Sequence, residues 1–469
     1  MAAESLKAKL VVIGAGPGGY VAAIRAAQLG SGVVLVEKQL LGGTCLNWGC
    51  IPTKALLACA EALETIKEAG DYGIKVGDPV PDLKAMVERK DKISEQLRNG
   101  IAQLLKANKV ELVKGTARLA SPNQVTVETE EGTKTIETER VIVATGSEPA
   151  RLPTFDFDQP AILTSTEGLE LTEIPKTMII VGSGVVGSEF ATIFNALGTK
   201  VTMVEMMPRI LPTEDERISQ QMKRILNKKG IEILTETTIE EIVEYSPAGV
   251  KAKLSSGDIL EGEKLLVSIG RSLNSANLGL EEIGVKLGQR GEILVNERME
   301  TNVPGIYAIG DVVGGILLAH VASFEGICAA ENAMGVDAVM NYNVVPACIF
   351  TEPEIASVGL TPAKAEEQGL EIKVGRFMFG GLGKALAMGK GQGFVQLVVD
   401  KSTDKILGCQ IMSAHASDLI HELALAIQVG VTAEDIGKTV HAHPSLAEAI
   451  MEAAEAAHDR AIHAAPARK

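Results

Sequence analysis

Short apolar runs alternate with longer helix-like stretches along much of this chain. The run at residues 10–13 is followed by a glycine-rich turn, an alanine-rich stretch at 20–29 and a second apolar run at 33–36. A short continuous apolar run suits a strand buried on both faces of a parallel sheet, and the alanine-rich stretch suits a helix. The pattern therefore predicts a strand–turn–helix–strand unit near the start of the chain.

The same unit recurs later. An apolar run at 178–181, a glycine turn, a helix-like stretch at 188–197 and an apolar run at 201–204 repeat its order. Gly14 lies 23 positions before Glu37, and Gly182 lies 23 positions before Glu205. Each turn has the form G-x-G-x-x-G followed by an acid, which is typical of dinucleotide-binding units. The glycines are Gly14, Gly16 and Gly19 in the first unit and Gly182, Gly184 and Gly187 in the second.

These residue types fit the chemistry of a dinucleotide. Gly14 permits a tight turn, Gly16 lets backbone N–H groups approach a pyrophosphate, and Gly19 allows close packing of helix and strand. The acid that ends the second strand can accept hydrogen bonds from a ribose diol. Glu205 would repel a 2′-phosphate, so the second site favours NAD over NADP. The chain is therefore predicted to bind two dinucleotides.

The rest of the pattern predicts further elements. We expect helices over 58–70 and 83–109 and strands over 110–119, 124–136 and 141–147, with a hairpin turn at Glu131-Gly132. The charged run at 88–92 is interpreted as a solvated helix face. From residue 346 onward, strands near 373–379, 393–400 and 405–412 precede helices over 417–430 and 445–457. That order indicates an α+β layer domain.

Length and charge restrict the class of protein. A chain of 469 residues is too long for one core, and 46% hydrophobic residues support a large interior. A formal net charge of −15 without a long basic run argues against a nucleic-acid partner. The first apolar run is too short for a signal segment or a membrane span, so we expect a cytoplasmic protein with no membrane partner.

Two of the six cysteines suggest a reactive pair. Cys45 and Cys50 stand in the glycine-flanked segment 42–54. A five-residue step overshoots one helical turn by about 140°, so the sulfurs would meet only if glycines such as Gly49 supplied an irregular backbone. A disulfide here would close a very small loop, which makes chemistry a better reason for it than stability. Lys54 and a helix N-terminus offer the cationic setting of reactive cysteines, and two buried, unbonded cysteines are the alternative.

The segment Gly-Gly-Thr-Cys-x-Asn-x-Gly-Cys-x-Pro-x-Lys resembles the redox-active site of the flavoprotein disulfide reductases. Leu46 and the run 51–57 are most similar to the dihydrolipoamide dehydrogenases of that family, whereas Trp48 and Thr53 depart from the common pattern. The resemblance covers nearly the whole chain. It implies an α/β fold of two Rossmann-like dinucleotide-binding domains plus a C-terminal α+β dimerisation domain. The implied domains are an FAD-binding domain at 1–150, an NAD-binding domain at 151–275, a central domain completing the FAD site at 276–347 and an interface domain at 348–469.

The resemblance also implies a reaction. Protein-bound dihydrolipoyl groups would be oxidised to lipoyl disulfides, with electrons passing through a Cys45–Cys50 disulfide and FAD to NAD+. Cys45 would form the mixed disulfide, and Cys50 would lie against the flavin. Lys54 would sit near the flavin and pair with Glu189, with a surface lysine as the alternative.

A histidine and a glutamate near the C-terminus resemble the family's acid–base dyad. His443 would remove the substrate's proton and Glu448 would orient its imidazole. Pro444 suits a first helical position, which would place His443 at a helix start. In the family each histidine serves the other subunit, so the implied partners are a second copy in a homodimer and a lipoyl-bearing protein of a 2-oxo acid dehydrogenase or glycine cleavage complex. A metal pair at His441 and His443 is disfavoured because no third ligand lies at a zinc-like spacing, and we expect no metal.

The cofactor contacts follow from the same resemblance. Because the cysteine pair follows the first unit, FAD is assigned to that unit and the nicotinamide to the second. Asp311 would bind a ribityl hydroxyl, with a helix cap as the alternative. The implied FAD contacts are Gly14, Gly16, Gly19, Glu37, Lys38, Gly43, Thr44, Lys54, Gly115, Thr145, Gly146, Ser147, Asp311, Leu317, Leu318, Ala319 and His320. The implied NAD contacts are Gly182, Gly184, Gly187, Glu189, Glu205 and Gly270.

Other functions differ at particular residues. A glutathione-like reductase would be expected to use NADPH, against which Glu205 argues. A mercuric-like reductase would carry a second cysteine pair near its C-terminus, and no cysteine follows Cys409. An inactive assembly subunit would lack Cys45, Cys50 or His443, and all three are present.

Overall fold

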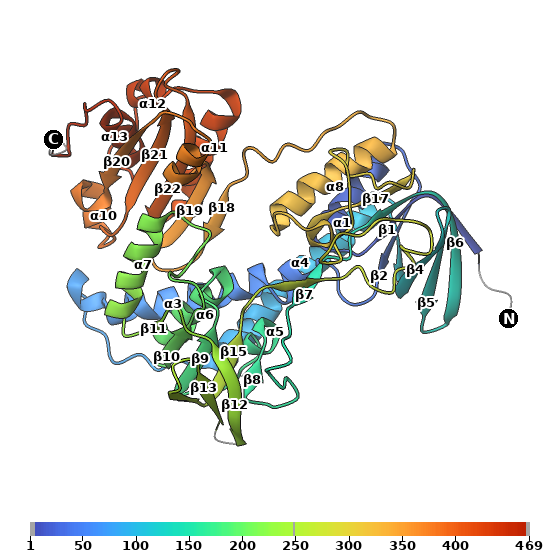
Figure 1. The fold of residues 1–469 in the computed structure, drawn as a ribbon, viewed down its shortest axis with the longest axis horizontal. Helices are drawn as coiled ribbons and strands as arrows, with labels where there is room; N and C mark the ends of the chain where they lie inside the picture. Colours follow the sequence, from blue (N-terminus) through green and yellow to red (C-terminus); the bar gives the residue numbers. More distant parts are fainter. Residues whose placement is uncertain (1–4, 247–248, 466–469) are drawn as a thin grey trace.

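The chain folds into three bodies, seen in a computed structural model that describes residues 5–246 and 249–465. Figure 1 shows a body built around the first sheet on the right, a second at the lower left and the C-terminal body at the upper left. The gold segment containing β17 and α8 lies with the first body, although it follows the second in sequence. The expected α/β fold with a C-terminal α+β domain is confirmed, and the sheet of that domain is antiparallel.

The first sheet has the order β3-β2-β1-β6-β5-β4, and β17 also pairs with β6. Residues 10–12 of β1 are fully buried, as the apolar run predicted. The strands are β1 (Ser5–Ile13), β2 (Val33–Glu37), β3 (Glu111–Lys114), β4 (Thr116–Ser121), β5 (Gln124–Thr129), β6 (Gly132–Val143) and β17 (Ile306–Ala308). Strand β17 adds in parallel to β6, so the later segment extends the first sheet directly.

Two strand predictions in this sheet were wrong in their bounds. The strand expected over 110–119 is divided into β3 and β4 at Gly115, where an added Cβ would lie 2.4 Å from the carbonyl oxygen of Glu128. The separate strands expected around residues 136 and 141 are one strand, β6. Its residues 132–137 pair antiparallel with β5 and its residues 135–143 pair parallel with β1. Because the two pairings overlap, the strand continues without a break.

Helices α1 (Pro17–Gln28) and α8 (Ala319–Ala333) pack closely together. A Cβ added to Gly18 would lie 2.8 Å from the carbonyl oxygen of Ala322, and one added to Gly326 would lie 2.5 Å from that of Gly18. Only glycine allows backbones to approach so closely. The helix after the first nucleotide turn is thereby fixed to the segment that carries Asp311.

The second body repeats the first unit. Its main sheet has the order β11-β10-β9-β15-β8, and a separate sheet has the order β12-β13-β14. Helices α1 and α6 each begin three residues before the expected start, because residues of the glycine motif form the first helical turn. The elements are β8 (Ile162–Leu163), α5 (Ser165–Gly168), β9 (Thr177–Val181), α6 (Val185–Ala196), β10 (Lys200–Val204), α7 (Glu216–Lys228), β11 (Glu232–Leu234), β12 (Ile239–Ser246), β13 (Gly249–Leu254), β14 (Ile259–Gly262) and β15 (Lys264–Val267). Strands β7 (Ser147–Pro149) and β16 (Arg271–Leu273) form a two-stranded link to the first body.

The C-terminal body is an antiparallel sheet of order β18-β19-β22-β21-β20 with helices packed on it. Its strands are β18 (Ala347–Ile349), β19 (Glu354–Gly359), β20 (Ile372–Met378), β21 (Phe394–Asp400) and β22 (Ile406–Ser413). Its helices are α9 (Pro362–Glu367), α10 (Gly383–Ala387), α11 (Ala416–Val429), α12 (Ala433–Lys438) and α13 (Glu448–Ala456). The helix start expected at Pro444 is wrong, because the chain bends at residues 443–444 and α13 begins only at Glu448.

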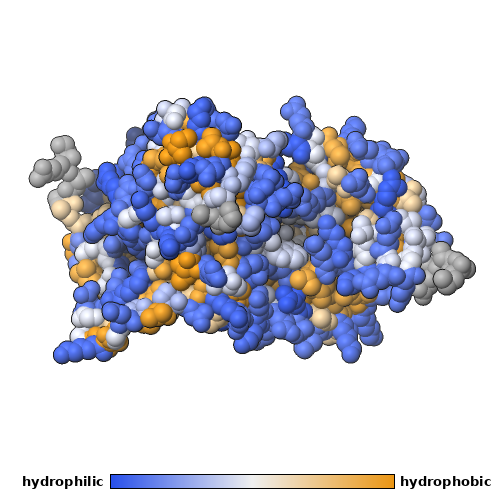
Figure 2. Space-filling view, turned by 90° about the horizontal axis from the view of Figure 1, so that it is seen from below, coloured by the Kyte–Doolittle hydropathy of each residue, from blue (hydrophilic) through white to orange (hydrophobic). Residues whose placement is uncertain are grey.

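Apolar side chains reach the surface in separate areas. Figure 2 shows orange areas divided by polar side chains across the face seen from below. Among the residues that the structure describes, none of the helices combines the length and the hydrophobicity needed to cross a bilayer.

Helices α3 (Cys50–Lys67) and α4 (Leu83–Ala107) connect the bodies, and α3 begins eight residues before the expected start. The interpretation of residues 88–92 as wholly solvated was wrong, because Lys90 is 1% exposed. Lys90 shares a helix face with Leu83, Val87 and Ser94, which are all buried. Its ammonium donates to the carbonyl oxygen of Leu169 at 3.2 Å and also contacts Glu170. A long aliphatic stem allows this burial because the charged end still finds acceptors.

We predict that Lys90→Ala destabilises the protein by about 2 kcal/mol, because it removes the buried stem and leaves a carbonyl without its donor. Urea unfolding followed by circular dichroism measures the change. The matched variant Lys92→Ala, at an exposed position of the same helix, should stay within about 0.5 kcal/mol. Equal effects of the two substitutions would contradict the role given to Lys90.

Candidate active site

The two cysteines meet at a break between helices. Cys45 lies in α2 (Gly43–Asn47) and Cys50 is the first residue of α3. Gly49, between them, has φ −141° and ψ −115°, and an added Cβ would lie 3.0 Å from the carbonyl oxygen of Thr44. The irregular backbone expected at this glycine is therefore present. Both cysteines are free thiols in this structure, and each shifts the pKa of the other.

The pKa values of the two thiols are shifted in opposite directions. The hydrogen bond from Cys45 lowers the pKa of Cys50 to about 7, against the effect of burial and with help from the nearby Lys54 cation. The same hydrogen bond, together with burial, raises the pKa of Cys45 well above its usual value. The two shifts have opposite directions, so Cys50 is the thiol of the pair that ionises more readily. A thiolate is both the nucleophile and the better leaving group in disulfide exchange.

Lys54 lies one helical turn beyond Cys50 and forms an ion pair with Glu189. Its Nζ is 2.8 Å from each carboxylate oxygen of Glu189, which belongs to α6 of the second body and is 3% exposed. The backbone N–H of Phe350 donates to Oε1 of Glu189 at 3.0 Å. The Lys54 cation also lies 4.6 Å from the centroid of the Phe350 ring. The alternative of a plain surface lysine is wrong, because Lys54 is held by groups from two other parts of the chain.

The first glycine turn fits a dinucleotide diphosphate. Gly14 has φ +100°, and an added Cβ would lie 2.4 Å from the carbonyl oxygen of Ala144. Gly16 begins α1 without a side-chain cap, so the first N–H groups of the helix are available to an anion. A Cβ on Gly43 would lie 2.7 Å from the Cα of Gly16, so side chains here would fill the cradle. Glu37 accepts hydrogen bonds from the N–H groups of residues 15 and 39, both at 2.7 Å.

The second turn repeats these contacts. Gly182 has φ +95°, and an added Cβ would lie 2.5 Å from the carbonyl oxygen of Ser268. Gly184 begins α6 without a side-chain cap, and nothing lies within 4 Å of a Cβ added to it. Glu205 accepts hydrogen bonds from the N–H groups of residues 183 and 207, both at 2.8 Å. The internal repeat thus extends to the hydrogen bonds of the acid, and this turn also fits a dinucleotide.

Asp311 is joined to groups from two other segments. It lies in η2 (Gly310–Val313), whose N-cap is Ile309, so the alternative of a helix-capping side chain is not supported. The hydroxyl of Ser147 donates to its carboxylate. Arg271 donates from Nε to that hydroxyl at 2.6 Å, and the same nitrogen lies 3.5 Å from Asp311. Sequence reasoning missed Arg271, whose only signal is its place directly after Gly270.

A buried glutamate next to this group was also missed. Glu325 of α8 is 2% exposed and accepts hydrogen bonds from the N–H of Gly310 and the hydroxyl of Tyr342, both at 2.6 Å. Burial raises the pKa of Glu325 against the opposing effect of these hydrogen bonds. Glu325 thereby fixes the backbone immediately before Asp311. Nothing in its local sequence indicates this contact.

The other residues that the resemblance assigns to FAD differ in the contacts that they make. Thr44 donates to the carbonyl of Ser147 at 3.3 Å, and Gly115 donates from its N–H to the carbonyl of Glu37 at 2.9 Å. The hydroxyl of Thr145 donates to the carbonyl of Asn274, and Gly146 has φ +70°. Helix α8 begins with Ala319 and His320 after Leu317 and the N-cap residue Leu318, and its N-terminus has no side-chain cap. Lys38 is exposed.

His443 and Glu448 form the expected pair. Nδ1 of His443 is 2.8 Å from Oε1 of Glu448, and Oε2 accepts a hydrogen bond from the N–H of Ser445 at 2.9 Å. Burial raises the pKa of Glu448, but these two hydrogen bonds outweigh it and hold the pKa below its usual value. The His443 side chain is 78% exposed. Within the described part of the chain, no hydrogen bond or ion pair joins this pair to Cys45 or Cys50.

His441 has separate partners. Its Nδ1 lies 2.8 Å from the carbonyl oxygen of Thr439, and its Nε2 lies 3.2 Å from a carboxylate oxygen of Glu422. Residues 5–246 and 249–465 contain no group of three His, Cys, Asp or Glu side chains arranged to hold a metal ion.

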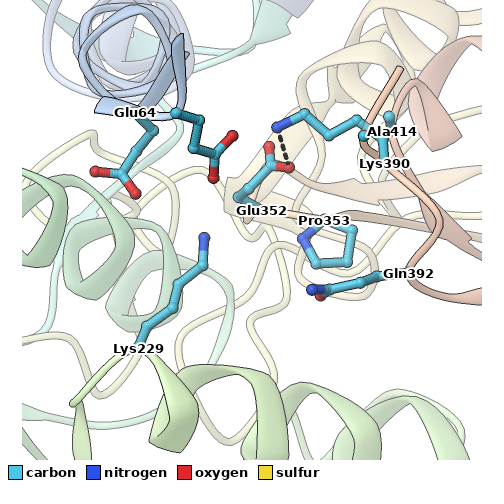
Figure 3. A pocket seen from close by; sticks show the side chains of 9 residues that line it. Glu64, Lys229, Glu352, Pro353, Lys390, Gln392 and Ala414 are labelled. Carbon is cyan, nitrogen blue, oxygen red and sulfur yellow. Dashed lines mark hydrogen bonds and ion pairs between the residues drawn. The ribbon is translucent and has the colours of Figure 1, made fainter. Parts of the chain in front are cut away.

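A charged pocket lies apart from the cysteines, at the other end of α3. Figure 3 shows Glu64 and Lys229 facing a Glu352–Lys390 pair, in which Nζ lies 2.9 Å from Oε1. Because Glu64 is 14 residues from Cys50 on one helix, the pocket is about 20 Å from the thiols. Both members of that ion pair belong to the C-terminal body, and Glu64 of α3 lines the same pocket.

Comparison with known families decides the class of protein. The family model for "Pyridine nucleotide-disulphide oxidoreductase" matches residues 8–326, and the model for the dimerisation domain of the same family matches residues 345–454. The chain belongs to the pyridine nucleotide-disulphide oxidoreductases. The family implies FAD and NAD(P) as cofactors, and the matched dimerisation domain supports a homodimer.

Individual relatives of this oxidoreductase are similar over nearly their full length. It is 44% identical to a dihydrolipoyl dehydrogenase of Chlamydia muridarum, with 98% of both chains covered. It is also 44% identical to a dihydrolipoyl dehydrogenase of Bacillus subtilis, with 97% of both covered. Among solved structures, LpdA of Mycobacterium tuberculosis matches with a TM-score of 0.90 at 28% identity, covering 96% of this chain and 99% of the other.

We predict that the reduced oxidoreductase is alkylated at Cys50 with an inflection near pH 7, because the pKa of this thiol is lowered to about 7. The rate rises with pH through the inflection, since the thiolate is the reactive form. Lys54→Met removes the nearby cation and should move the inflection to higher pH. Mass spectrometry of the Cys50 peptide after timed iodoacetamide treatment measures the rate. Lys67→Met, on the same helix but near its other end, should leave the inflection in place; a wild-type inflection near pH 8.5 would contradict the assignment.

Proposed function

We propose that this oxidoreductase oxidises dihydrolipoyl groups carried by a partner protein to lipoyl disulfides and reduces NAD+. The observation that carries the proposal is the pair of free cysteines at the helix break, with Lys54 one helical turn beyond Cys50 and held by Glu189. The near full-length similarity to dihydrolipoyl dehydrogenases supports the same substrate. The lipoyl carrier belongs to a 2-oxo acid dehydrogenase or glycine cleavage complex in this proposal, and the location is cytoplasmic.

The thiol exchange proceeds in two displacements. A thiolate of the substrate attacks Sγ of Cys45 in the oxidised pair; the Cys45–Cys50 bond breaks, and Cys50 leaves as a thiolate. The lowered pKa of Cys50 makes it the better leaving group. The first substrate thiol has released its proton to solvent on forming the attacking thiolate. The second substrate thiol, deprotonated by His443, then attacks the substrate sulfur of the mixed disulfide. The lipoyl disulfide forms, the bond to Cys45 breaks, and His443 gives its proton to the leaving Cys45 sulfur, so the reduced pair holds a Cys45 thiol and a Cys50 thiolate.

The remaining groups of the chain hold and orient the reacting groups. Bound FAD supplies the two-electron carrier between the dithiol and NAD+. Lys54 keeps a positive charge beside the Cys50 thiolate, and Glu189 holds that lysine in place. Glu448 fixes the tautomer of His443 by accepting from Nδ1, which leaves Nε2 for the substrate. Because His443 is exposed in the single chain, we assign it to the site of the second subunit.

The residues and domain bounds expected from the sequence complete the proposal. The first glycine turn with Glu37, Ser147 and Asp311 binds FAD, and the second with Glu205 and Gly270 binds NAD. The FAD-binding, NAD-binding, central and interface domains span 1–150, 151–275, 276–347 and 348–469. The contact of residues 306–333 with the first sheet supports the separate assignment of the central segment.

The proposal is tested by following NADH formation from dihydrolipoamide and NAD+, beside the NADPH-driven reduction of glutathione disulfide. We expect the first reaction and not the second. The variant Cys50→Ser should retain bound FAD and lose dihydrolipoamide oxidation, because its hydroxyl cannot form the disulfide. Activity with glutathione disulfide alone would overturn the substrate assignment, and loss of FAD from Cys50→Ser would make the residue architectural.

Glu205 provides a separate test of cofactor choice. We expect the wild type to use NAD+ at least about 100-fold better than NADP+ in kcat/KM, because the carboxylate accepts from a ribose diol and repels a 2′-phosphate. Glu205→Gln keeps the size and an acceptor but removes the charge, and should lower this preference about tenfold. Steady-state kinetics with both dinucleotides measures the ratio. The matched substitution Glu232→Gln, on the neighbouring strand β11, should leave the ratio unchanged; equal use of the two dinucleotides by the wild type would refute the assignment.

A further inference from the structure

Phe350 contacts both members of the Lys54–Glu189 ion pair. It immediately follows β18 in the C-terminal body, whereas Lys54 belongs to α3 and Glu189 to α6. Its backbone N–H donates to Oε1 of Glu189 at 3.0 Å, and its ring centroid lies 4.6 Å from Nζ of Lys54. One residue therefore uses its main chain on the anion and its side chain on the cation.

The ring and the carboxylate both contact the Lys54 ammonium. Both oxygens of Glu189 accept from Nζ at 2.8 Å, and the negative face of an aromatic ring attracts a cation at the observed distance. The Lys54 side chain is 30% exposed, so water reaches part of it, and the ring is a second protein group in contact with the ammonium. A lysine stem has many rotamers, and a second contact on the ammonium reduces their number.

We infer that Phe350 is a positioning residue, whose ring holds the Lys54 ammonium beside Cys50 while its backbone holds Glu189. The inference rests on the proposed function, because it assigns Phe350 to the reaction of the same thiol pair. It gives the C-terminal body a second part in the chemistry. Besides carrying His443, that body sets the position of the cation that stabilises the leaving thiolate.

The substitution Phe350→Leu tests this role because it removes the ring and retains the backbone N–H. In the holoenzyme we expect kcat for dihydrolipoamide oxidation to fall about fivefold, with the KM changed less than about twofold. The alkylation inflection of Cys50 should move to higher pH by about half a unit, since the cation is held less firmly beside the thiolate. Phe350→Tyr keeps the aromatic face and should retain the wild-type inflection and most of the rate.

A matched control exists in the second body. Phe157 lies under Arg151, with the guanidinium carbon 5.0 Å from its ring centroid, and this contact is outside the proposed site. Phe157→Leu loses the same kind of cation–ring contact and should alter neither kcat nor the Cys50 inflection. Bound FAD and thermal unfolding are measured for every variant, and Phe350→Met supplies a second ring-free side chain of similar size.

Two results would overturn the inference. One is a Phe350→Leu protein with FAD bound whose inflection and kcat both match the wild type. The other is a Phe350→Tyr protein whose kcat and Cys50 inflection change as much as those of Phe350→Leu. The aromatic face would then not be the cause of the change. The thiol titration needs no dihydrolipoamide, so failure of the proposed substrate would leave this measurement readable and the two failures distinguishable.

Discussion

The Lys54–Glu189 ion pair is the contact on which the arrangement of the three bodies depends. A carboxylate that is 3% exposed is costly unless it is paired and hydrogen-bonded. Glu189 satisfies this need with Lys54 from the first body and with the N–H of Phe350 from the C-terminal body. Because Glu189 itself belongs to the second body, groups from all three bodies meet where its negative charge is compensated. Lys54 also lowers the pKa of Cys50, so the contact that joins the bodies also tunes the reactive thiol.

The two nucleotide turns have the same local structure. In each, a glycine with positive φ approaches the carbonyl of a neighbouring strand, and the acid accepts from the N–H between the first two glycines. The units differ in the segment after the acid. In the first unit the chain enters α2 and reaches the two cysteines, whereas in the second it continues to α7 without such a motif. The position of the cysteines therefore distinguishes two otherwise equivalent sites, and their chemistry depends on that difference.

Features set by local chain physics were predictable from the sequence. The glycine spacing, the acid at the end of each second strand and the break at Gly49 depend on neighbouring residues, and the structure contains all three. The union of two predicted strands in β6, the burial of Lys90 and the start of α13 depend on contacts between distant segments. Arg271, Glu325 and Phe350 were missed for the same reason, since each acts on a residue far away in sequence. A single sequence carries no local signal for such contacts.

His443 and Cys50 lie in separate places in one chain. The His443 side chain is exposed on the C-terminal body, and Cys50 lies at the helix break beside Lys54. A base that must remove protons from a large substrate benefits from exposure, whereas a leaving thiolate benefits from a nearby cation, because burial alone raises the pKa of a thiol. Under the proposed function, dimerisation brings the exposed base of one subunit to the thiol pair of the other. The interface then does more than stabilise the fold, because it lets the base of one subunit and the thiols of the other act on one substrate.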